Sequence, residues 1–131
     1  MNSVTTQQQI IMSLYQDLIL DHYRNPRNQG KLTKATHHSE ASNPTCGDRL
    51  QMDIIVKNDI IEDVRFSGSG CAISQASASL LTEYVKEKPV KEALALAPKD
   101  ILELLGVALS PARLKCGLLS LETLKKTLSN K

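Results

Sequence analysis

The spacing of hydrophobic positions divides the chain into a helical start, a central sheet and a helical second half. Residues 1–12 are mainly polar and predict a flexible lead-in. Ser13 and Gln16 have the spacing of a capping box, which predicts a helix from about residue 13. Residues 25–30, which include Pro26 and Gly30, would end it. The predicted apolar face of this helix contains Leu14, Tyr15, Leu18, Ile19 and His22.

Alternation of apolar and polar residues after Asp48 predicts a β-hairpin. Every second residue from 50 to 56 is apolar, as in a half-buried strand. Asn58 and Asp59 form a turn pair, and residues 60–66 return as a second strand. The polar residues 34–42 leave a short edge strand as an option. The positions predicted to share one side of each strand are Leu50, Met52, Ile54 and Val56, then Glu62, Val64 and Phe66.

From Cys71 onward the apolar spacing becomes helical. A stripe from Ile73 to Val85 predicts one helix, and Pro89, Pro98 and Ser110 followed by Pro111 mark the starts of three more. These end near residues 96, 105 and 128. The order of helix, sheet and helices predicts an α+β fold, a small antiparallel sheet of about three strands packed against several helices. The predicted core stripes are Ile73, Ala76, Ser77, Leu80, Leu81, Tyr84 and Val85, then Leu114, Leu118, Leu121, Leu124 and Leu128.

Length and charge narrow the class of protein. The chain has 131 residues, 41% of them hydrophobic, which suits one compact domain over residues 13–131. The formal charge of +2 gives no reason to expect a nucleic-acid partner. No apolar run reaches the length of a membrane helix, and no basic residue precedes Ile10 and Ile11 as a targeting signal would require. We therefore expect a cytoplasmic protein, in which three cysteines favour metal binding, catalysis or free thiols over disulfides.

The three thiols of Cys46, Cys71 and Cys116, with the Asp48 carboxylate, form a potential four-ligand metal site. Cysteine is often buried, so the alternative is that these residues only pack. Helical phase argues against packing, because Cys71 points about 180° from Leu80 and Cys116 about 160° from Leu114. Both also fall in or near the first turn of a predicted helix, where the backbone N–H groups stabilise a thiolate.

Neighbouring residues add to this metal-site hypothesis. Gly68 and Gly70 would leave room beside Cys71 for an inorganic group. Zinc accepts thiolates and a carboxylate, and an iron–sulfur cluster accepts the same thiolates. Lys115 is either a solvated lysine or a charge that assists Cys116.

For other residues we weighed a ligand role against a plain structural one. Asp48 is interpreted as a ligand, with a simple Gly-Asp turn as the alternative. His37 and His38 are taken as solvated strand residues, with a ligand role as the alternative, and His22 as a hydrogen-bonded helix histidine.

Three segments resemble the signatures of the IscU/SufU/NifU N-terminal family. Residues 43–48 read Asn-Pro-Thr-Cys-Gly-Asp, and residues 111–116 read Pro-Ala-Arg-Leu-Lys-Cys. Residues 66–79 read Phe-Ser-Gly-Ser-Gly-Cys-Ala-Ile-Ser-Gln-Ala-Ser-Ala-Ser. The opening of the predicted first helix, with Asp-His-Tyr-Arg-Asn-Pro-Arg-Asn at residues 21–28, is also similar. The resemblance spans about residues 13–128.

The resemblance implies a scaffold for iron–sulfur cluster assembly. Such a scaffold receives sulfur from a cysteine desulfurase, binds iron and passes a transient [2Fe–2S] cluster to acceptor proteins. By motif position, the ligands are Cys46, Asp48, Cys71 and Cys116, which also hold zinc in the cluster-free form. The three cysteines are the candidate sulfur acceptors. We expect a monomer or weak homo-oligomer.

Two branches of the family fit in part. The IscU branch has a His where this chain has Lys115, and its Hsp70-binding segment is replaced by Leu-Ser-Pro-Ala-Arg at residues 109–113, which argues against chaperone recognition. Residues 111–116 look more like the SufU branch, whose members act as zinc-dependent sulfurtransferases. That branch carries an insertion which the 45 residues from Cys71 to Cys116 are too few to hold.

Three functions therefore stay open. The first is a non-enzymatic scaffold, and the second is a zinc-dependent sulfurtransferase that stimulates the desulfurase. The third is a structural zinc module for protein binding, which predicts unfolding when the metal is removed.

Overall fold

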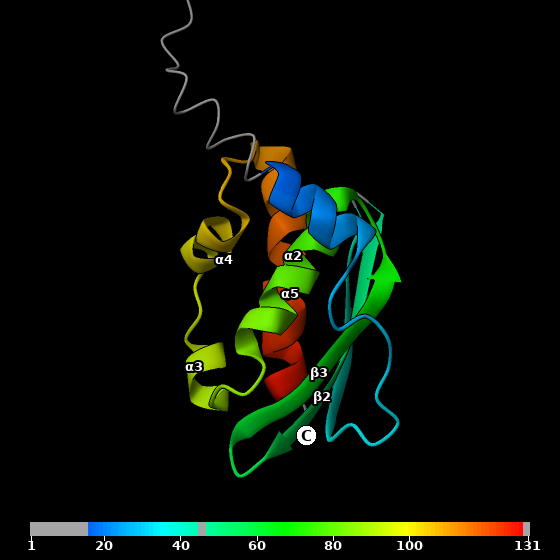
Figure 1. Cartoon of the computed structure of the whole chain (residues 1–131), viewed down its shortest axis with the longest axis vertical. Coiled ribbons are helices and arrows are strands. Elements are labelled where there is room, and N and C mark those ends of the chain that lie inside the picture. Colours follow the sequence, from blue (N-terminus) through cyan, green and yellow to red (C-terminus); the bar gives the residue numbers. More distant parts are fainter. Residues whose placement is uncertain (1–15, 45–46, 130–131) are drawn as a thin grey trace, which may run out of the picture.

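The computed structural model describes residues 16–44 and 47–129, and it shows a three-stranded antiparallel sheet with helices on one face (Figure 1). This confirms the predicted α+β fold. The division into residues 1–12 and 13–131 stays a prediction, because residues 1–15, including the proposed capping box, lie outside the described part. A helix spans residues 16–24. The remaining elements are β1 His37–Asn43, β2 Asp48–Lys57, β3 Ile60–Ser69, α2 Ala72–Val85, α3 Val90–Leu94, α4 Pro98–Leu105 and α5 Pro111–Ser129.

The sheet has the order β1-β2-β3, so β2 is its central strand. The optional edge strand is therefore real, and it pairs from Asn43 opposite Asp48 to His37 opposite Ile54. Alternation places Leu50, Met52 and Ile54 of β2 on the inner face, where they are fully buried. The hairpin prediction is confirmed by this pairing and by the pairing of β2 with β3.

One inward position in β3 was predicted wrongly. Glu62 is exposed, and Ile61 is fully buried in its place. The cause is a register shift: Ile55 pairs with Asp63 but Val56 pairs with Ile61, so Glu62 has no partner in the ladder. Such a bulge interrupts the alternation by one residue, which a period of two cannot anticipate.

Helices α2 and α5 cover the inner face of the sheet, while α3 and α4 lie on their outer side (Figure 1). The two covering helices are joined by buried hydroxyl groups. Ser77 Oγ donates to Gly117 O at 2.7 Å and lies 2.7 Å from Ser120 Oγ. These short contacts hold α2 and α5 close together, which matters for the cysteine that each one carries.

Because α2 is buried on most sides, its predicted apolar stripe was too narrow. Residues 74–82 are all buried, whereas Tyr84, assigned to the core, is 41% exposed and lies under the Lys88 ammonium. The core positions predicted for the start of α5 were wrong by about half a turn around the helix axis. Leu114 and Leu118 are only half-buried, and Cys116 and Leu119 take the core positions.

The N-terminal helix is fastened to α2 by a polar contact. His22 is buried, as predicted for a hydrogen-bonded histidine, and its Nδ1 lies 2.7 Å from Ser79 Oγ. The same Oγ accepts the N–H of Arg27 at 2.9 Å. Burial, and next the positive charge of Arg27, lower the pKa of His22 below its usual 6.5.

Candidate functional site

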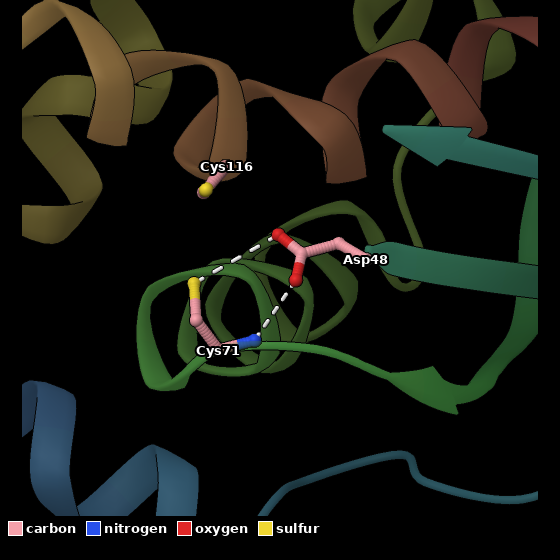
Figure 2. Close-up of side chains that lie close together, drawn as sticks. All are labelled: Asp48, Cys71 and Cys116. Atoms are coloured by element: carbon pink, nitrogen blue, oxygen red, sulfur yellow. Dashed lines mark hydrogen bonds between the residues drawn. The ribbon is translucent and has the colours of Figure 1, made fainter. Parts of the chain in front are cut away.

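Three potential metal ligands converge at one end of the sheet. Asp48 begins β2, Cys71 immediately precedes α2, and Cys116 lies on α5. One ligand atom from each, a carboxylate oxygen and two sulfurs, lies within 4.8 Å of the others. Figure 2 shows the three side chains pointing toward a common space. The grouping of Asp48 with Cys71 and Cys116 that the sequence suggested is thus present.

Asp48 is held by its neighbours rather than exposed in a turn. Its side chain is 1% exposed, and the residue pairs with Asn43 in the sheet. One carboxylate oxygen, Oδ1, accepts the backbone N–H of Cys71 at 3.0 Å. The other, Oδ2, lies 3.8 Å from the Cys71 thiol, which donates to it (Figure 2). The N–H of Cys71 at the start of α2 therefore holds the Asp48 carboxylate in place.

Cys71 is the N-cap residue of α2, which confirms its predicted place at a helix start. It is half-buried, whereas Cys116 is buried. Its carbonyl accepts the N–H of Gln75 at 3.1 Å and the hydroxyl of Ser74 at 3.0 Å. These two bonds fix the backbone that carries the thiol.

The glycines before Cys71 are required by close contacts. A Cβ on Gly70 would lie 2.5 Å from Ser74 Oγ and 2.7 Å from Asp48 Oδ1. Gly68 has a φ of 143°, and a Cβ there would lie 2.1 Å from the Arg49 carbonyl oxygen. The space was predicted to serve an inorganic group, but protein atoms fill it. Gly70 instead lets the Asp48 carboxylate approach the start of α2.

Cys116 differs from its prediction in its burial. It is 3% exposed, so it does not lie away from the core. It is the sixth residue of α5, near the first turn as predicted, and its thiol lies 3.8 Å from the Ala112 carbonyl oxygen, to which it donates. The error follows from the rotated stripe of α5. Burial of Cys116 nevertheless serves the site, because its sulfur faces Asp48 and Cys71 from the core side (Figure 2).

Of the two remaining candidate residues, Cys46 and Lys115, the structure describes only Lys115. Cys46 lies outside the described residues. Lys115 is exposed and lines a pocket of about 350 Å³ together with Asn43, Pro44 and Leu118. Pro44, which lines this pocket, precedes Cys46 by two residues in the sequence.

The two strand histidines are not at this end of the sheet. His37 pairs with Ile54 at the opposite end of β1, and His38 Nδ1 contacts a carboxylate oxygen of Asp53. Six residues of strand, about 20 Å, separate His37 from Asn43 beside the site. The alternative in which one of them is the fourth ligand is therefore wrong.

The donor set fits a metal with thiolate preference. A tetrahedral zinc ion with bonds of about 2.3 Å to sulfur and about 2.0 Å to oxygen holds a sulfur and an oxygen about 3.5 Å apart. The contact between the Cys71 sulfur and Asp48 Oδ2 is already 3.8 Å, and all three donors lie within 4.8 Å. Small side-chain rotations would bring them around one ion. Three described donors leave one position of a tetrahedron to be filled.

Sequence reasoning missed Ser74 and Gln75 as parts of the site. Ser74 is fully buried and bonds the Cys71 carbonyl, and Gln75 is 8% exposed. Their only sequence signal is polarity inside an apolar helix, at three and four residues after Cys71. Polar residues at this spacing face the same side as the helix start.

Comparison with known proteins places the chain in a family. Residues 14–130 match the NifU-like N terminal domain. The chain is 48% identical over 112 residues to the iron-sulfur cluster assembly scaffold protein IscU of Aquifex aeolicus, covering 84% of this chain and 71% of that protein. It is 40% identical over 131 residues to the zinc-dependent sulfurtransferase SufU of Bacillus subtilis, covering 87% and 88% of the two chains.

Solved structures agree with these sequence matches. The crystal structure of FiSufU, from the SUF system of Fervidobacterium islandicum, superposes with a TM-score of 0.76 at 30% identity and covers 86% of this chain and 94% of that one.

Within residues 16–44 and 47–129, no helix is both long and apolar enough to cross a membrane.

Proposed function

The chain belongs to the NifU-like N-terminal domain family, and from this premise we propose that it is a scaffold on which iron–sulfur clusters are assembled. The observation that carries the proposal is the convergence of Asp48, Cys71 and Cys116 from three separate elements within 4.8 Å. In this role the cluster is cargo, built on the thiolates and then released to acceptor proteins.

Cys46 would complete the ligand set. It is two residues from Asp48, so chain geometry keeps the two Cα atoms within about 7 Å of each other. Pairing of Asn43 with Asp48 closes the loop that contains it. Three thiolates and one carboxylate supply four ligands, two for each iron of a [2Fe–2S] cluster.

Sulfur would enter through one of the thiolates. A thiolate attacks the outer sulfur of a persulfide on a cysteine desulfurase, forming a new S–S bond as the desulfurase thiolate leaves. Reduction to sulfide then requires electrons from an external donor. Cys71 is the described thiol best placed for this attack, because it is half-buried while Cys116 is 3% exposed.

Asp48 would be the ligand that lets the cluster leave. A carboxylate binds iron less tightly than a thiolate does, since soft thiolates are preferred in such clusters. Asp48 also has an alternative partner, the backbone N–H of Cys71 at 3.0 Å. Its oxygen can return to that partner when the cargo departs.

A second candidate, a zinc-dependent sulfurtransferase, is favoured by the match to SufU along most of both chains. Zinc would hold the site closed until one cysteine leaves it to accept sulfur, and Lys115 would assist electrostatically beside Cys116. The helices between Cys71 and Cys116 argue against it. α2, α3, α4 and α5 follow one another through short connections that leave no room for the insertion expected of that branch.

Anaerobic reconstitution tests the scaffold proposal. The full chain is incubated with ferrous iron, cysteine, a cysteine desulfurase and a reductant, and visible absorption and metal content are measured. We expect a cluster that moves to an apo acceptor, and no cluster on a Cys116→Ser variant. Strong stimulation of desulfurase turnover by the zinc form, without cluster formation, would instead support the sulfurtransferase. In that case Lys115→Ala should slow sulfur transfer.

A further inference from the structure

Gln75 contains a buried nitrogen whose hydrogen-bonding capacity is unused. Its Nε2 is shielded from solvent and, alone among the buried side-chain nitrogen and oxygen atoms in the described part of the chain, has no hydrogen-bond partner. The residue as a whole is 8% exposed. An unpaired donor in a protein interior is destabilising, and native proteins contain few. This N–H donor is therefore available to a group that the polypeptide itself does not supply.

The position of Gln75 along α2 directs the donor toward the site. Gln75 follows Cys71 by one helical turn, and its backbone N–H donates to the Cys71 carbonyl at 3.1 Å. Helical side chains slope toward the N-terminus, and one turn advances about 5.4 Å. The carboxamide therefore reaches back to the level of Cys71.

The position around the helix agrees. At about 100° per residue, Gln75 points about 40° from Cys71 and about 160° from Ser77. Ser77 faces α5, where it bonds Gly117. Gln75 thus lies closer to the Cys71 side of α2 than to the direction in which Ser77 bonds α5.

We propose that Gln75 Nε2 donates a hydrogen bond to the sulfur of Cys71 when that sulfur is a metal-bound thiolate. The idea rests on the proposed function, since it takes Cys71 to be a ligand. In the structure the Cys71 thiol donates to Asp48 Oδ2, 3.8 Å away. When Asp48 turns to the metal and the thiol loses its proton, the sulfur becomes an acceptor with negative charge. Hydrogen bonds from neighbouring groups tune metal affinity and the potential of cluster sulfurs.

This role has a thermodynamic signature. The donor is unsatisfied without metal and satisfied with it, so it lowers stability in the first state and raises affinity in the second. Gln75→Met removes the N–H and nearly keeps the volume. Thr82→Val is the matched control, because Thr82 is also buried on α2 but donates to the Ser79 carbonyl at 3.0 Å, far from the site.

The experiment compares the two variants with the parent chain in two states. Melting temperatures are measured on chelator-treated protein, and zinc affinity is measured by competition with a coloured chelator. Gln75→Met should raise the metal-free melting temperature and weaken zinc binding by about threefold to tenfold. It should also shift the sulfur-to-cobalt charge-transfer band of the cobalt form. Thr82→Val should lower the melting temperature and leave both metal readouts unchanged.

Several outcomes would overturn the inference. A lower metal-free melting temperature for Gln75→Met would mean that the amide already has a partner, such as a buried water. Unchanged zinc affinity and cobalt spectrum would mean that the donor does not reach the sulfur. If Gln75→Met does not fold, Gln75→Asn, one methylene shorter, must show the same loss of affinity. Absence of zinc and cobalt binding by the parent chain would contradict the proposed site itself, which is a separate result.

Discussion

The two ends of the sheet connect their strands in different ways. At the end formed by Asn58 and Asp59, both turn residues have positive φ, 54° and 62°, as a tight two-residue hairpin turn requires. The chain after α2 then covers the adjoining strand end. The N–H of Ile61 donates to Lys88 O at 2.9 Å, and the N–H of Glu87 donates to Ile61 O at 2.7 Å.

At the other end, groups that proteins usually pair or expose are buried together. Asp48 is 1% exposed, Cys116 is 3% exposed, and the amide of Gln75 has no partner. The Asp48 carboxylate packs so closely against Gly70 that an added Cβ would lie 2.7 Å from its Oδ1. Among the described residues, the turn end leaves no buried side-chain nitrogen or oxygen unpaired, whereas the site end leaves Gln75 Nε2 unpaired. This difference is what the proposed ligand site at the second end would explain.

The largest effect should come from the core at the turn end. Ile61→Ala removes a fully buried side chain and should lower the free energy of unfolding by about 2–5 kcal/mol. Urea unfolding measures this, with the half-buried Ile60→Ala as control. Zinc affinity, measured where the variant is folded, should be unchanged. A large loss of affinity would show that the two ends are not independent.

The opposite pattern is expected when a ligand is removed. Cys71→Ser should weaken zinc binding by more than about 100-fold, because second-shell changes alone cost 10- to 100-fold. The half-buried side chain contributes little to the core, so the metal-free melting temperature should stay close to that of the parent. Chelation of the parent should lower its melting temperature without unfolding it. Complete unfolding on chelation would support the structural zinc module instead.

Gly70→Ala should disturb the site by crowding. Its Cβ would press on Ser74 Oγ and Asp48, and overpacking of this kind costs about 1–3 kcal/mol. Both stability and zinc affinity should fall. Gly30→Ala is the control, since Gly30 has a φ of 137°, no atom within 4 Å of an added Cβ, and no proposed ligand beside it in the sequence. It should reduce stability through backbone strain alone, so an equal loss of affinity in both variants would exclude crowding as the cause.

Asp48→Ala tests the assignment of cluster release to the carboxylate. If Asp48 is the labile ligand, a reconstituted cluster should persist longer on this variant, as followed by the decay of visible absorption in the presence of an apo acceptor. Asp48→Asn retains an oxygen that can accept the Cys71 N–H, so it separates ligation from positioning of the helix start. Faster loss of the cluster from Asp48→Ala would reject this role.

The smallest effect concerns pH. Because the pKa of His22 is lowered in the folded state by burial, folding favours its neutral form. The stability it contributes is complete above its unfolded pKa near 6.5 and is lost as the pH falls from that value through the lower pKa of the folded state. His22→Gln should flatten the unfolding free energy between about pH 7 and 5.5. Hydrogen bonds from Arg27 to Asp21 and from Arg49 to Glu40 lower the pKa values of these two carboxyl groups. Their effect on stability therefore falls below the usual pKa values of 3.8 and 4.5, outside the pH range in which His22 titrates.

The sequence predicted the order of elements because that order follows from local spacing, whereas the candidate ligands came from residue chemistry and from the family resemblance. Proline and serine marked the helix starts, and the turn pair at 58–59 marked the hairpin. The prediction failed where tertiary packing determines which side chain is buried. A bulge exchanged Glu62 for Ile61, and contact of α5 with both α2 and the sheet rotated Cys116 into the core. The pairing of Asp48 with the start of α2 joins residues 23 apart in sequence, which no local pattern encodes.

The central claim is that Cys46, Asp48, Cys71 and Cys116 bind one metal together. X-ray absorption at the zinc edge of the zinc-loaded chain tests it most directly. The account predicts three sulfurs at about 2.3 Å and one oxygen at about 2.0 Å, with two sulfurs remaining in Cys116→Ser. Imidazole scattering, or a sulfur count that does not change in Cys116→Ser, would contradict it.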